Sequence, residues 1–372
     1  MVPPEPTAAI VTPGLREGNL RSTSLEAALL GLAHAAVDAA SAWLLFFDLR
    51  SFAPETFTSL VLLYNALAFA GQVPLGLLLD RLRTPRAFGA LGVALAGLAL
   101  LVAPLSPVAG VVAIGTGNAL FHLGAGAHVL ARSESRAAES GIFVGPGAAG
   151  LFAGIWLGTA GVACRAVLLA LLAGALPLLF RLLPRTSAAV QPPRNPDSPG
   201  QGRLATLALA TSCLLASVTV RSVVGSVVNA SWRGVDPWVM ASLALAAFAG
   251  KAAGGLVADR LGWIRTSAFA LVAGALLLGL GLGSPVGAVA GVLLLQSTLP
   301  VTLKATHLLV PDRPGLAFGL PCAALLAGAL VALSPITIVS TPTFLLAQLL
   351  VSAALVVVGL RFMKVGTLPA RT

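Results

Sequence analysis

Long apolar runs recur along almost the whole chain, and only short polar segments separate them. Each run is close to the roughly 20 residues that a helix needs to cross the ~30 Å hydrocarbon core of a membrane. Because the runs are continuously apolar and do not alternate with polar positions, they predict membrane-spanning helices and exclude a β-barrel. We predict twelve spans, at residues 24–47, 57–79, 87–105, 108–131, 140–161, 166–183, 204–229, 238–258, 265–283, 286–308, 315–337 and 343–362.

One long polar segment interrupts this pattern in the middle of the chain. Residues 184–203 read PRTSAAVQPPRNPDSPGQGR, a composition typical of a linker. Six predicted spans precede this segment and six follow it, so we expect an all-α integral membrane protein made of two six-helix bundles. The expected divisions are a cytoplasmic tail at 1–23, a first bundle at 24–183, the linker at 184–203, a second bundle at 204–364 and a cytoplasmic tail at 365–372.

The two halves contain a repeated sequence. AFAGQVPLGLLLDRL (68–82) and AFAGKAAGGLVADRL (247–261) are identical at nine of 15 positions, at an offset of 179 residues. Each copy ends the second span of its half and enters the following loop. The same offset relates His128 to His307, for which we expect a gating or surface role. Parallel six-span repeats are the layout of transporters that bind their substrate between two halves.

The composition agrees with a membrane protein. Of the 372 residues, 57% are hydrophobic and only 10% are charged, and the mean hydropathy is +0.95. A soluble chain carries about 25% charged residues, so a soluble domain, a disordered chain and a nucleic-acid-binding protein are excluded. The net charge is +10. If the N-terminus is cytoplasmic, the only positively charged loop residues on the outer side are Arg50, Arg165 and Arg233. This asymmetry predicts cytoplasmic termini and no nucleic-acid partner.

Asp38 is the one carboxylate deep inside a predicted span, and His34 lies one turn before it on the same helix face. A charge at the bilayer centre costs about 2.5–3.5 kcal/mol on insertion scales, so a charged residue there requires a specific role. We interpret Asp38 and His34 as a pair that carries a coupled proton. The alternative is a structural hydrogen bond that ties the first span to a neighbour.

Arg221 lies in the outer half of the seventh predicted span. Its guanidinium stays charged, so it needs an acid, backbone carbonyls or an anionic substrate, and Asp38 is the expected acid when no substrate is bound. We predict that Arg221 binds substrate. The alternative is that its long side chain extends toward the outer surface.

Five further polar residues within the spans are candidates for substrate contact. His122 and Asn118 share a face of the fourth span, where His122 is either a ligand or a packing residue. Tyr64 and Asn65 on the second span could bond to a substrate or to another helix. Lys304, in the inner third of the tenth span, either extends to the surface or attracts an anion. No cysteine or second carboxylate joins the histidines at depth, so we expect no metal site.

GQVPLGLLLDRLRTPR (71–86) and GKAAGGLVADRLGWIR (250–265) resemble the cytoplasmic loop signature of the major facilitator superfamily, although Arg83 stands where glycine is expected. The resemblance implies the major facilitator fold, with spans one and seven lining the central cavity. It also implies a gate in which each motif carboxylate contacts arginines or a helix N-terminus. The dense arginines after Asp80 suggest that the first copy forms the stronger contact. The implied gating residues are Gly71, Gly76, Asp80, Arg81, Gly250, Gly255, Asp259 and Arg260.

Two further resemblances lie within this superfamily. GIFVGPGAAGLFAG (141–154) is similar to the glycine-proline motif of its antiporters, and implies that Gly145, Pro146 and Gly147 bend the fifth span. A narrower resemblance to fosmidomycin-resistance-type exporters rests on His34, Asp38, GNALFHLGAGAHVLAR (117–132), Arg221-Ser222 and LPVTLKATHLLVPDRPGLAFGL (299–320). Phe121-His122-Leu123 departs from the Phe-His-Pro sequence that is typical of those exporters.

These features favour a secondary transporter over an enzyme or a receptor, because no catalytic motif and no extramembrane domain are visible. We predict a proton-coupled antiporter that exports a small anionic or zwitterionic organic compound by alternating access. The alternative is a symporter that imports a small anion or metabolite on the same fold. The proton is the expected coupling ion, and no other cofactor is expected. We expect a monomer that crosses the plasma (inner) membrane twelve times.

Overall fold

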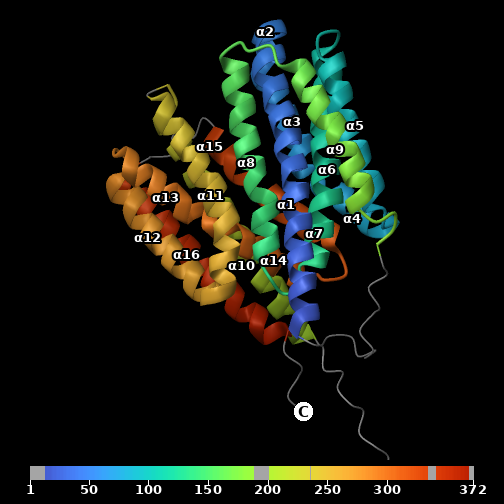
Figure 1. Cartoon of the computed structure of the whole chain (residues 1–372). Coiled ribbons are helices and arrows are strands. Elements are labelled where there is room, and N and C mark those ends of the chain that lie inside the picture. Colours follow the sequence, from blue (N-terminus) through green and yellow to red (C-terminus); the bar gives the residue numbers. More distant parts are fainter. Residues whose placement is uncertain (1–12, 188–200, 235, 334–340, 368–372) are drawn as a thin grey trace, which may run out of the picture.

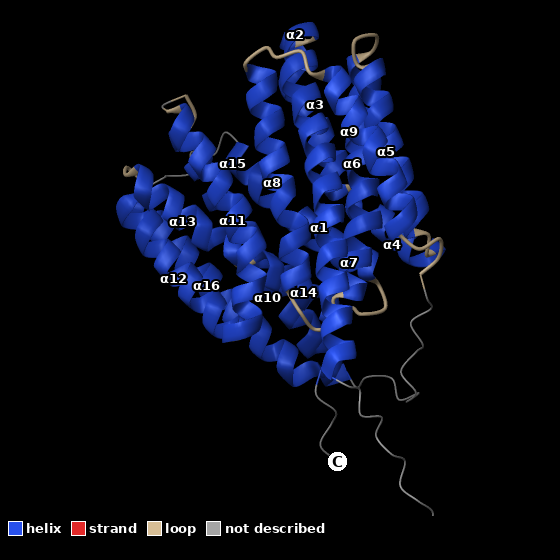
Figure 2. Cartoon of the chain, viewed as in Figure 1, coloured by secondary structure: helices blue, strands red, loops and turns tan. Residues whose placement is uncertain are grey.

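The structure is a computed structural model that describes residues 13–187, 201–234, 236–333 and 341–367. Helices and short connecting turns make up these ranges, and none of them contains a strand (Figures 1 and 2). Some predicted segments lie outside the described residues: tail residues 1–12 and 368–372, linker residues 188–200, and the end of the eleventh predicted span, 334–337.

Twelve helical segments of the described chain are long and apolar enough to cross a membrane, which confirms the predicted fold class. Most begin at a proline, whose fixed φ and missing N–H suit the first turn of a helix. The segments are Ser22–Leu49, Pro54–Leu82, Pro85–Val102, Pro107–Arg132, Ala138–Thr159, Arg165–Leu182, Gly202–Trp232, Pro237–Leu261, Trp263–Gly281, Pro285–Leu309, Pro314–Val331 and Pro342–Lys364.

Four spans are not single α-helices. The first contains α1 (Pro13–Trp43) and a π-helical turn, Leu44–Leu49. Such turns are frequent at functional sites, and another begins at His122. The second span contains α3 (Phe57–Asn65), a π-helical turn (Ala66–Ala70) and α4 (Gln72–Leu82). The fourth contains α6 (Pro107–Phe121), a π-helical turn (His122–Gly126) and α7 (Ala127–Arg132), and the tenth contains α13 (Pro285–Ser297) and α14 (Leu299–Leu309).

The buried apolar residues form two main clusters. One is drawn from residues 27–183, with only Leu303, Phe318 and Cys322 added from the second half; the other is drawn from residues 210–363, with Ala137 added from the first. Each cluster thus belongs to one group of helices, one from each half of the chain. Besides the helices already named, the first group contains α5 (Pro85–Val102), α8 (Ala138–Thr159) and α9 (Arg165–Leu182), and the second contains α10 (Gln201–Trp232), α11 (Pro237–Leu261), α12 (Trp263–Gly281), α15 (Pro314–Leu333) and α16 (Pro342–Thr367).

The two groups of helices approach each other near the end of the molecule where α1 begins and α16 ends, and they diverge toward the opposite end (Figure 1). Small residues make this contact close. Gly76 on α4 lies against the backbone of Gly315 on α15, and Gly255 on α11 lies against the backbone of Ala137. We call this contact the seam. Because glycine has no Cβ, the two halves meet backbone to backbone there.

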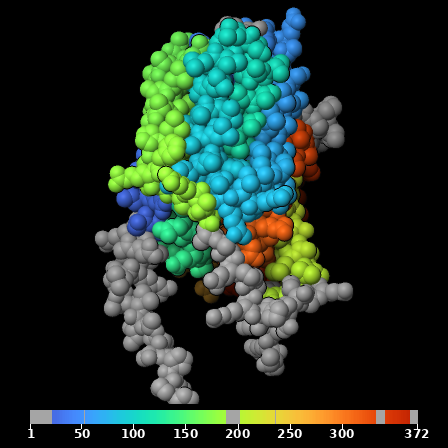
Figure 3. All heavy atoms as spheres, turned by 90° about the vertical axis from the view of Figure 1, so that its right-hand side faces the viewer, coloured from blue at the N-terminus to red at the C-terminus, as the bar shows by residue number. Residues whose placement is uncertain are grey.

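The outward faces of the helices are apolar. Exposed large side chains on α5 and α9 include Leu91, Leu98, Leu101, Val167 and Leu171, and these two helices cover much of the face seen in Figure 3. A soluble protein rarely exposes so many large apolar side chains on one surface. This surface therefore fits contact with lipid.

Candidate functional site

Asp38 on α1 lies at the centre of a cluster of polar side chains in the first half. Its carboxylate is 3.1 Å from His34 Nε2 and 3.9 Å from His122 Nε2. Asn118 donates an amide hydrogen bond of 2.9 Å to Asp38 and one of 3.3 Å to Ser41. The i, i+4 spacing of His34 and Asp38 places them on one face of α1, as the sequence predicted, and the π-helical turn at His122 brings in the fourth span.

Both imidazole rings of the cluster are oriented by backbone carbonyls. His34 Nδ1 donates to the carbonyl oxygen of Phe143 at 3.0 Å, and His122 Nδ1 donates to that of Asn118 at 2.8 Å. A carbonyl oxygen can only accept, so the network assigns a hydrogen to Nδ1 in both rings. Nε2 of His34 and the Asp38 carboxylate, 3.1 Å apart, therefore require one proton between them. The cluster is built to hold a proton that either group can carry.

Aromatic and glycine neighbours shape the space around His34. Its ring stacks on Phe143 with centroids 4.9 Å apart and meets His122 edge-on at 4.3 Å. Gly147 on α8 lies directly against the imidazole, so that a methyl group at this position would overlap the ring. The sequence predicted that Gly145, Pro146 and Gly147 bend the fifth span. In the structure α8 is one continuous helix across Pro146, and the clear local effect of Gly147 is to make room for His34.

The other two candidates on the second span differ in position. Tyr64 is buried in the core of the first half, within electrostatic reach of Asp38. Asn65 donates its amide to the carbonyl oxygen of Val61 on its own helix at 2.7 Å. The structure thus brings Tyr64 toward the Asp38 cluster, whereas the Asn65 amide is held by its own helix.

Arg221 does not pair with Asp38, contrary to the expectation from the sequence. Its Nε donates to the carbonyl oxygen of Ser217 at 3.2 Å, its Nη2 donates to the Thr302 hydroxyl at 3.1 Å, and its Nη1 donates to the Thr298 hydroxyl. These partners belong to α10 and to the tenth span of the same half, while His34, His122 and Asn118 already surround Asp38. No carboxylate within the described chain lies within ion-pair distance of Arg221.

A cavity of about 180 Å³ lies beside the Arg221 guanidinium. Its polar lining residues come from α10 and α13, and its apolar ones come from the same two helices, from α14 and from α15. Arg221 is 6% exposed, so its charge is nearly removed from solvent and is met only by neutral oxygens. An anion in this cavity would supply the missing negative charge. The polar lining residues are Ser222, Ser226, Asn229 and Gln296.

Lys304 is not at the surface, which corrects its interpretation as a side chain that extends there. The side chain is fully buried, and Nζ donates to the carbonyl oxygen of Leu130 at 2.7 Å. Leu130 belongs to α7 of the other half, so this hydrogen bond crosses the seam. The sequence could not show this, because it does not reveal which helix faces the tenth span.

Lys251 on α11 is a residue of the site that the sequence analysis did not select. It lies within electrostatic reach of Asp38, His122 and Cys322. A signal for it existed in the repeat, because Lys251 occupies the position of Gln72 in the first copy. A charge that replaces a neutral residue within a repeated membrane segment points to a role that only one half performs.

Asp80 and Asp259 form equivalent contacts across the seam. The Asp80 carboxylate accepts backbone N–H bonds from Gly315 (2.7 Å) and Leu316 (2.8 Å), and the Asp259 carboxylate accepts them from Ala137 (3.0 Å) and Ala138 (2.9 Å). Each carboxylate therefore meets the positive N-terminal end of a helix in the other half.

The relative strength of these two contacts differs from the sequence expectation. Asp259 also accepts a bond of 2.8 Å from Trp263 Nε1 and lies 3.9 Å from Arg136. No arginine of the first motif binds Asp80: Arg81 is exposed, and Arg86 donates to the carbonyl oxygen of Leu183. Arg313 of the other half acts on Asp80 only at longer range, so the second copy has the richer set of direct partners.

The remaining gating residues occupy equivalent places in the two copies. Gly76 and Gly255 lie in the seam itself, Gly250 packs on the backbone of Leu293, and Gly71 packs within its own span. Arg260, like its counterpart in the first copy, is exposed. Arg83 ends α4 with a φ of 58°, a left-handed conformation that favours glycine, and its counterpart Gly262 has a φ of 95°. The left-handed backbone thus explains why the loop signature that this motif resembles has glycine at this position.

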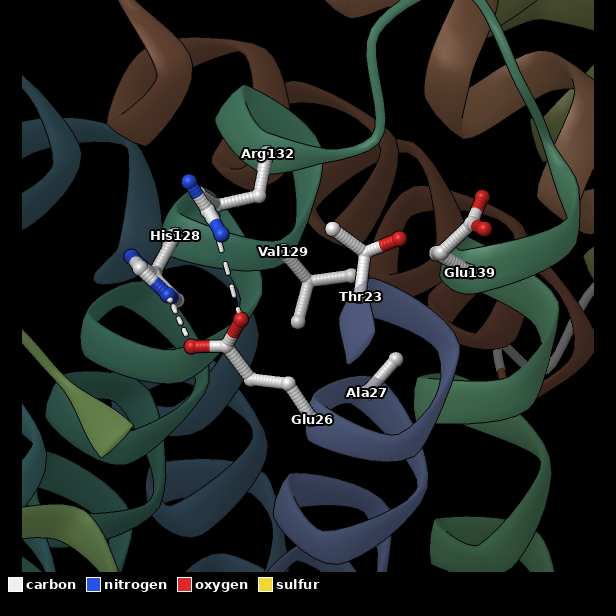
Figure 4. A pocket seen from close by; sticks show the side chains of 7 residues that line it. All are labelled: Thr23, Glu26, Ala27, His128, Val129, Arg132 and Glu139. Carbon is white, nitrogen blue, oxygen red and sulfur yellow. Dashed lines mark hydrogen bonds and ion pairs between the residues drawn. The ribbon is translucent and has the colours of Figure 1, made fainter. Parts of the chain in front are cut away.

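The end of the first half that lies near the seam contains a second charged cluster (Figure 4). Glu26 lies 2.8 Å from His128 Nε2 and 3.7 Å from Arg132 Nε, which ties α1 to α7. The counterpart of His128 in the repeat is His307, which is buried and forms no such pair. One group among the described residues could also surround a cation, because its potential ligand atoms lie within 4.8 Å of one another. The group consists of His34, Asp38 and His122.

Comparison with known proteins supports the fold. No protein-family model and no curated protein sequence matches the chain. Among solved structures, the E. coli fucose:proton symporter is 13% identical with a TM-score of 0.65 and covers 94% of this chain and 100% of its own. The human organic anion transporter MFSD10 is 14% identical with a TM-score of 0.65, over 92% and 99% of the two chains.

A bacterial homologue of the iron transporter ferroportin in an outward-facing state is also similar, with 15% identity and a TM-score of 0.60 over 93% and 99% of the two chains. These structures are major facilitator superfamily transporters, so the chain has the fold of that superfamily. At such low identity the similarity establishes the fold alone.

Proposed function

We propose that the chain is a secondary transporter that couples proton movement to the transport of a small organic anion or zwitterion. The observation that carries this proposal is the contact of 3.1 Å between His34 Nε2 and the Asp38 carboxylate in the middle of a membrane-spanning helix, with His34 Nδ1 directed at the carbonyl oxygen of Phe143. A buried carboxylate beside an oriented imidazole can take up and release a proton without changing its position. The similar folds include a proton symporter and an organic anion transporter, so the fold accommodates both parts of the proposal.

The substrate class is inferred from Arg221. Its guanidinium faces a cavity of about 180 Å³ and has neutral hydrogen-bond partners only. A carboxylate or phosphonate could form two parallel hydrogen bonds with it and neutralise its charge. Asn229 and Gln296 in the cavity wall would bond to polar groups elsewhere on a substrate. A purely cationic compound would be repelled from this site.

We propose alternating access with the structure in its outward-facing state. The loops with dense positive charge lie at the end where the two halves meet, and positive loops face the cytoplasm in most membrane proteins. The plasma membrane and cytoplasmic termini belong to the same proposal. So do a monomeric state, the absence of any cofactor besides the proton, and the narrower likeness to fosmidomycin-resistance-type exporters.

Antiport and export are the proposed mode, because one proton-binding carboxylate suffices to exchange a proton for a substrate. Symport is the second candidate, and Lys251 favours it: when Asp38 is neutralised, the nearby lysine loses its negative neighbour and attracts an anion more strongly. By thermodynamic linkage, a proton that strengthens substrate binding is itself bound more tightly when the substrate is present. The two are then most readily carried together.

Proteoliposomes distinguish these cases. A thermal-stability screen with small carboxylates and phosphonates, each paired with a neutral amide or ester, would first identify a ligand. Uptake of that ligand is then measured with the pH gradient in each direction and with none. A transporter of this class must accumulate the ligand only with a gradient, and the gradient's direction separates antiport from symport. Equal uptake under all three conditions would contradict proton coupling.

A further inference from the structure

Lys251 is the one intramembrane cation of the described chain that has neither a hydrogen bond nor an ion pair. Arg221 is held by two threonines and a carbonyl, and Lys304 is held by the carbonyl oxygen of Leu130. Asp38 interacts with Lys251 only at longer range, since His34 and Asn118 already occupy its oxygens. An ammonium has three donors, so Lys251 retains unused capacity to bind an anion.

The backbone around Lys251 lies where α11 contacts the first half, next to the seam, and we call this place the floor. The Lys251 carbonyl oxygen lies against Gly141 of α8, and Gly255, one turn further along α11, lies against Ala137. The residue is only partly buried, although the helix is packed tightly at this level. Its ammonium is close enough to His122 and Asp38 of the first half to interact with them electrostatically.

The repeat shows that the charge is specific to one half. At the equivalent position Gln72 is buried, and its Nε2 donates to the carbonyl oxygen of Ala68 at 2.6 Å within its own helix. The first copy therefore carries a neutral side chain whose donor is satisfied within its own helix, while the second copy presents an ammonium without a hydrogen bond. A charge near the bilayer centre is costly, so an unpaired one has to be compensated by something that binds.

We propose that Lys251 binds the anionic group of the transported compound at this floor, as a second cationic contact deeper than Arg221. This inference rests on the proposed function and sharpens it, because it places the anion between the two halves, where both can hold it. Substrate would then contact α11 of the second half and the Asp38 cluster of the first at once. A compound bound in this way is released when the halves separate at the seam.

The small number of lysines makes a direct test possible. The chain has three, Lys251, Lys304 and Lys364. The purified full chain in lipid nanodiscs is treated with pyridoxal phosphate or with uncharged pyridoxal, followed by borohydride. The aldehyde carbon condenses with the unprotonated Nζ amine and releases one water, and hydride then reduces the C=N bond to a stable secondary amine. Mass spectrometry gives the extent of labelling at each lysine.

Lys364 is exposed and provides the internal reference for the intrinsic reactivity of the two reagents. We expect the preference for the phosphate-bearing reagent to be roughly ten-fold greater at Lys251 than at Lys364, because an ammonium without a hydrogen bond attracts a phosphate more strongly in surroundings of low dielectric than at an exposed site. Lys304 should remain unlabelled. Lys251→Gln, which installs the residue of the first repeat, should remove the preferential label and leave that of Lys364 unchanged.

Three results would overturn the proposal: no label at Lys251, the same reagent preference at Lys251 and Lys364, or loss of the preference at Lys251 in Arg221→Gln. The last would show that Arg221 holds the anion alone. None of these outcomes depends on transport, so they are distinguishable from failure of the proposed function, which appears as uptake without a pH gradient.

Discussion

Asp80 and Asp259, which occupy the same place in the two repeats, each bind the first turn of a helix in the opposite half of the molecule. The two contacts are related by the repeat, so the seam has an internal two-fold character. Their surroundings differ, because Asp259 also lies 3.9 Å from Arg136 of the first half, whereas Arg313 acts on Asp80 only at longer range. We therefore expect the Asp259 side of the seam to be held somewhat more firmly.

This asymmetry predicts the effect of removing each carboxylate. Asp259→Ala should shift the population away from the closed seam more than Asp80→Ala does. Loss of a carboxylate that caps a helix costs about 0.5–2 kcal/mol, and Asp259→Ala also loses the ion pair with Arg136, which crosses the seam. Double electron–electron resonance distances between labels on α7 and α14 measure the two populations. Equal shifts would show that the extra partners contribute nothing.

Asp38→Asn tests the proton-binding cluster. The amide can still bond to His34 but cannot exchange a proton at neutral pH, so gradient-driven accumulation should be lost while exchange of substrate for substrate continues. Both are measured in proteoliposomes. Asn65→Ala serves as the matched control, because the Asn65 amide bonds only to its own helix. Accumulation by Asp38→Asn at the wild-type level would rule out Asp38 as the proton carrier.

Gly147→Ala tests the space around His34. The added methyl group would overlap the imidazole and displace it from Asp38, so this variant should lose gradient-driven accumulation as Asp38→Asn does. Overpacking of this kind costs about 1–3 kcal/mol, which full-length expression and thermal unfolding would reveal. Gly174→Ala on α9 is the control, because nothing lies near its Cβ position. Normal accumulation by Gly147→Ala would mean that the exact position of His34 is unimportant.

Arg221→Lys tests how the cavity selects its ligand. Lysine keeps the charge but loses the planar pair of donors, so an anionic ligand should bind about ten-fold more weakly while its neutral analogue is unaffected. Isothermal calorimetry with both compounds provides the comparison. If the acid and its amide lose affinity equally, Arg221 shapes the cavity without recognising charge.

Arg83→Gly tests the backbone at the end of α4. Arg83 has a φ of 58°, and glycine adopts this conformation without the Cβ clash, so the substitution should stabilise the protein by about 1 kcal/mol. The thermal midpoint should rise by a few degrees. No rise would mean that contacts of the arginine side chain offset the strain of its backbone.

The sequence predicted the spans and the pairing of His34 with Asp38 because both depend on local spacing. Apolar run length fixes the number of spans, and a separation of four residues fixes a common helix face. It did not predict the partners of Arg221 and Lys304, because these lie on helices that are far away in the sequence. The sequence did not predict the position of Lys251 either, because the carboxylate that it interacts with, Asp38, lies in the other half.

The seam of main chain against main chain has a consequence for turnover. Where Gly76 meets Gly315, no interlocking side chains have to leave their rotamers before the halves separate, and none has to be sorted when they return. The side-chain entropy lost on closure is correspondingly small at this point. The rate of opening should therefore be set by the polar contacts beside it, from Lys304 to Leu130 and from the backbone of Gly315 to Asp80.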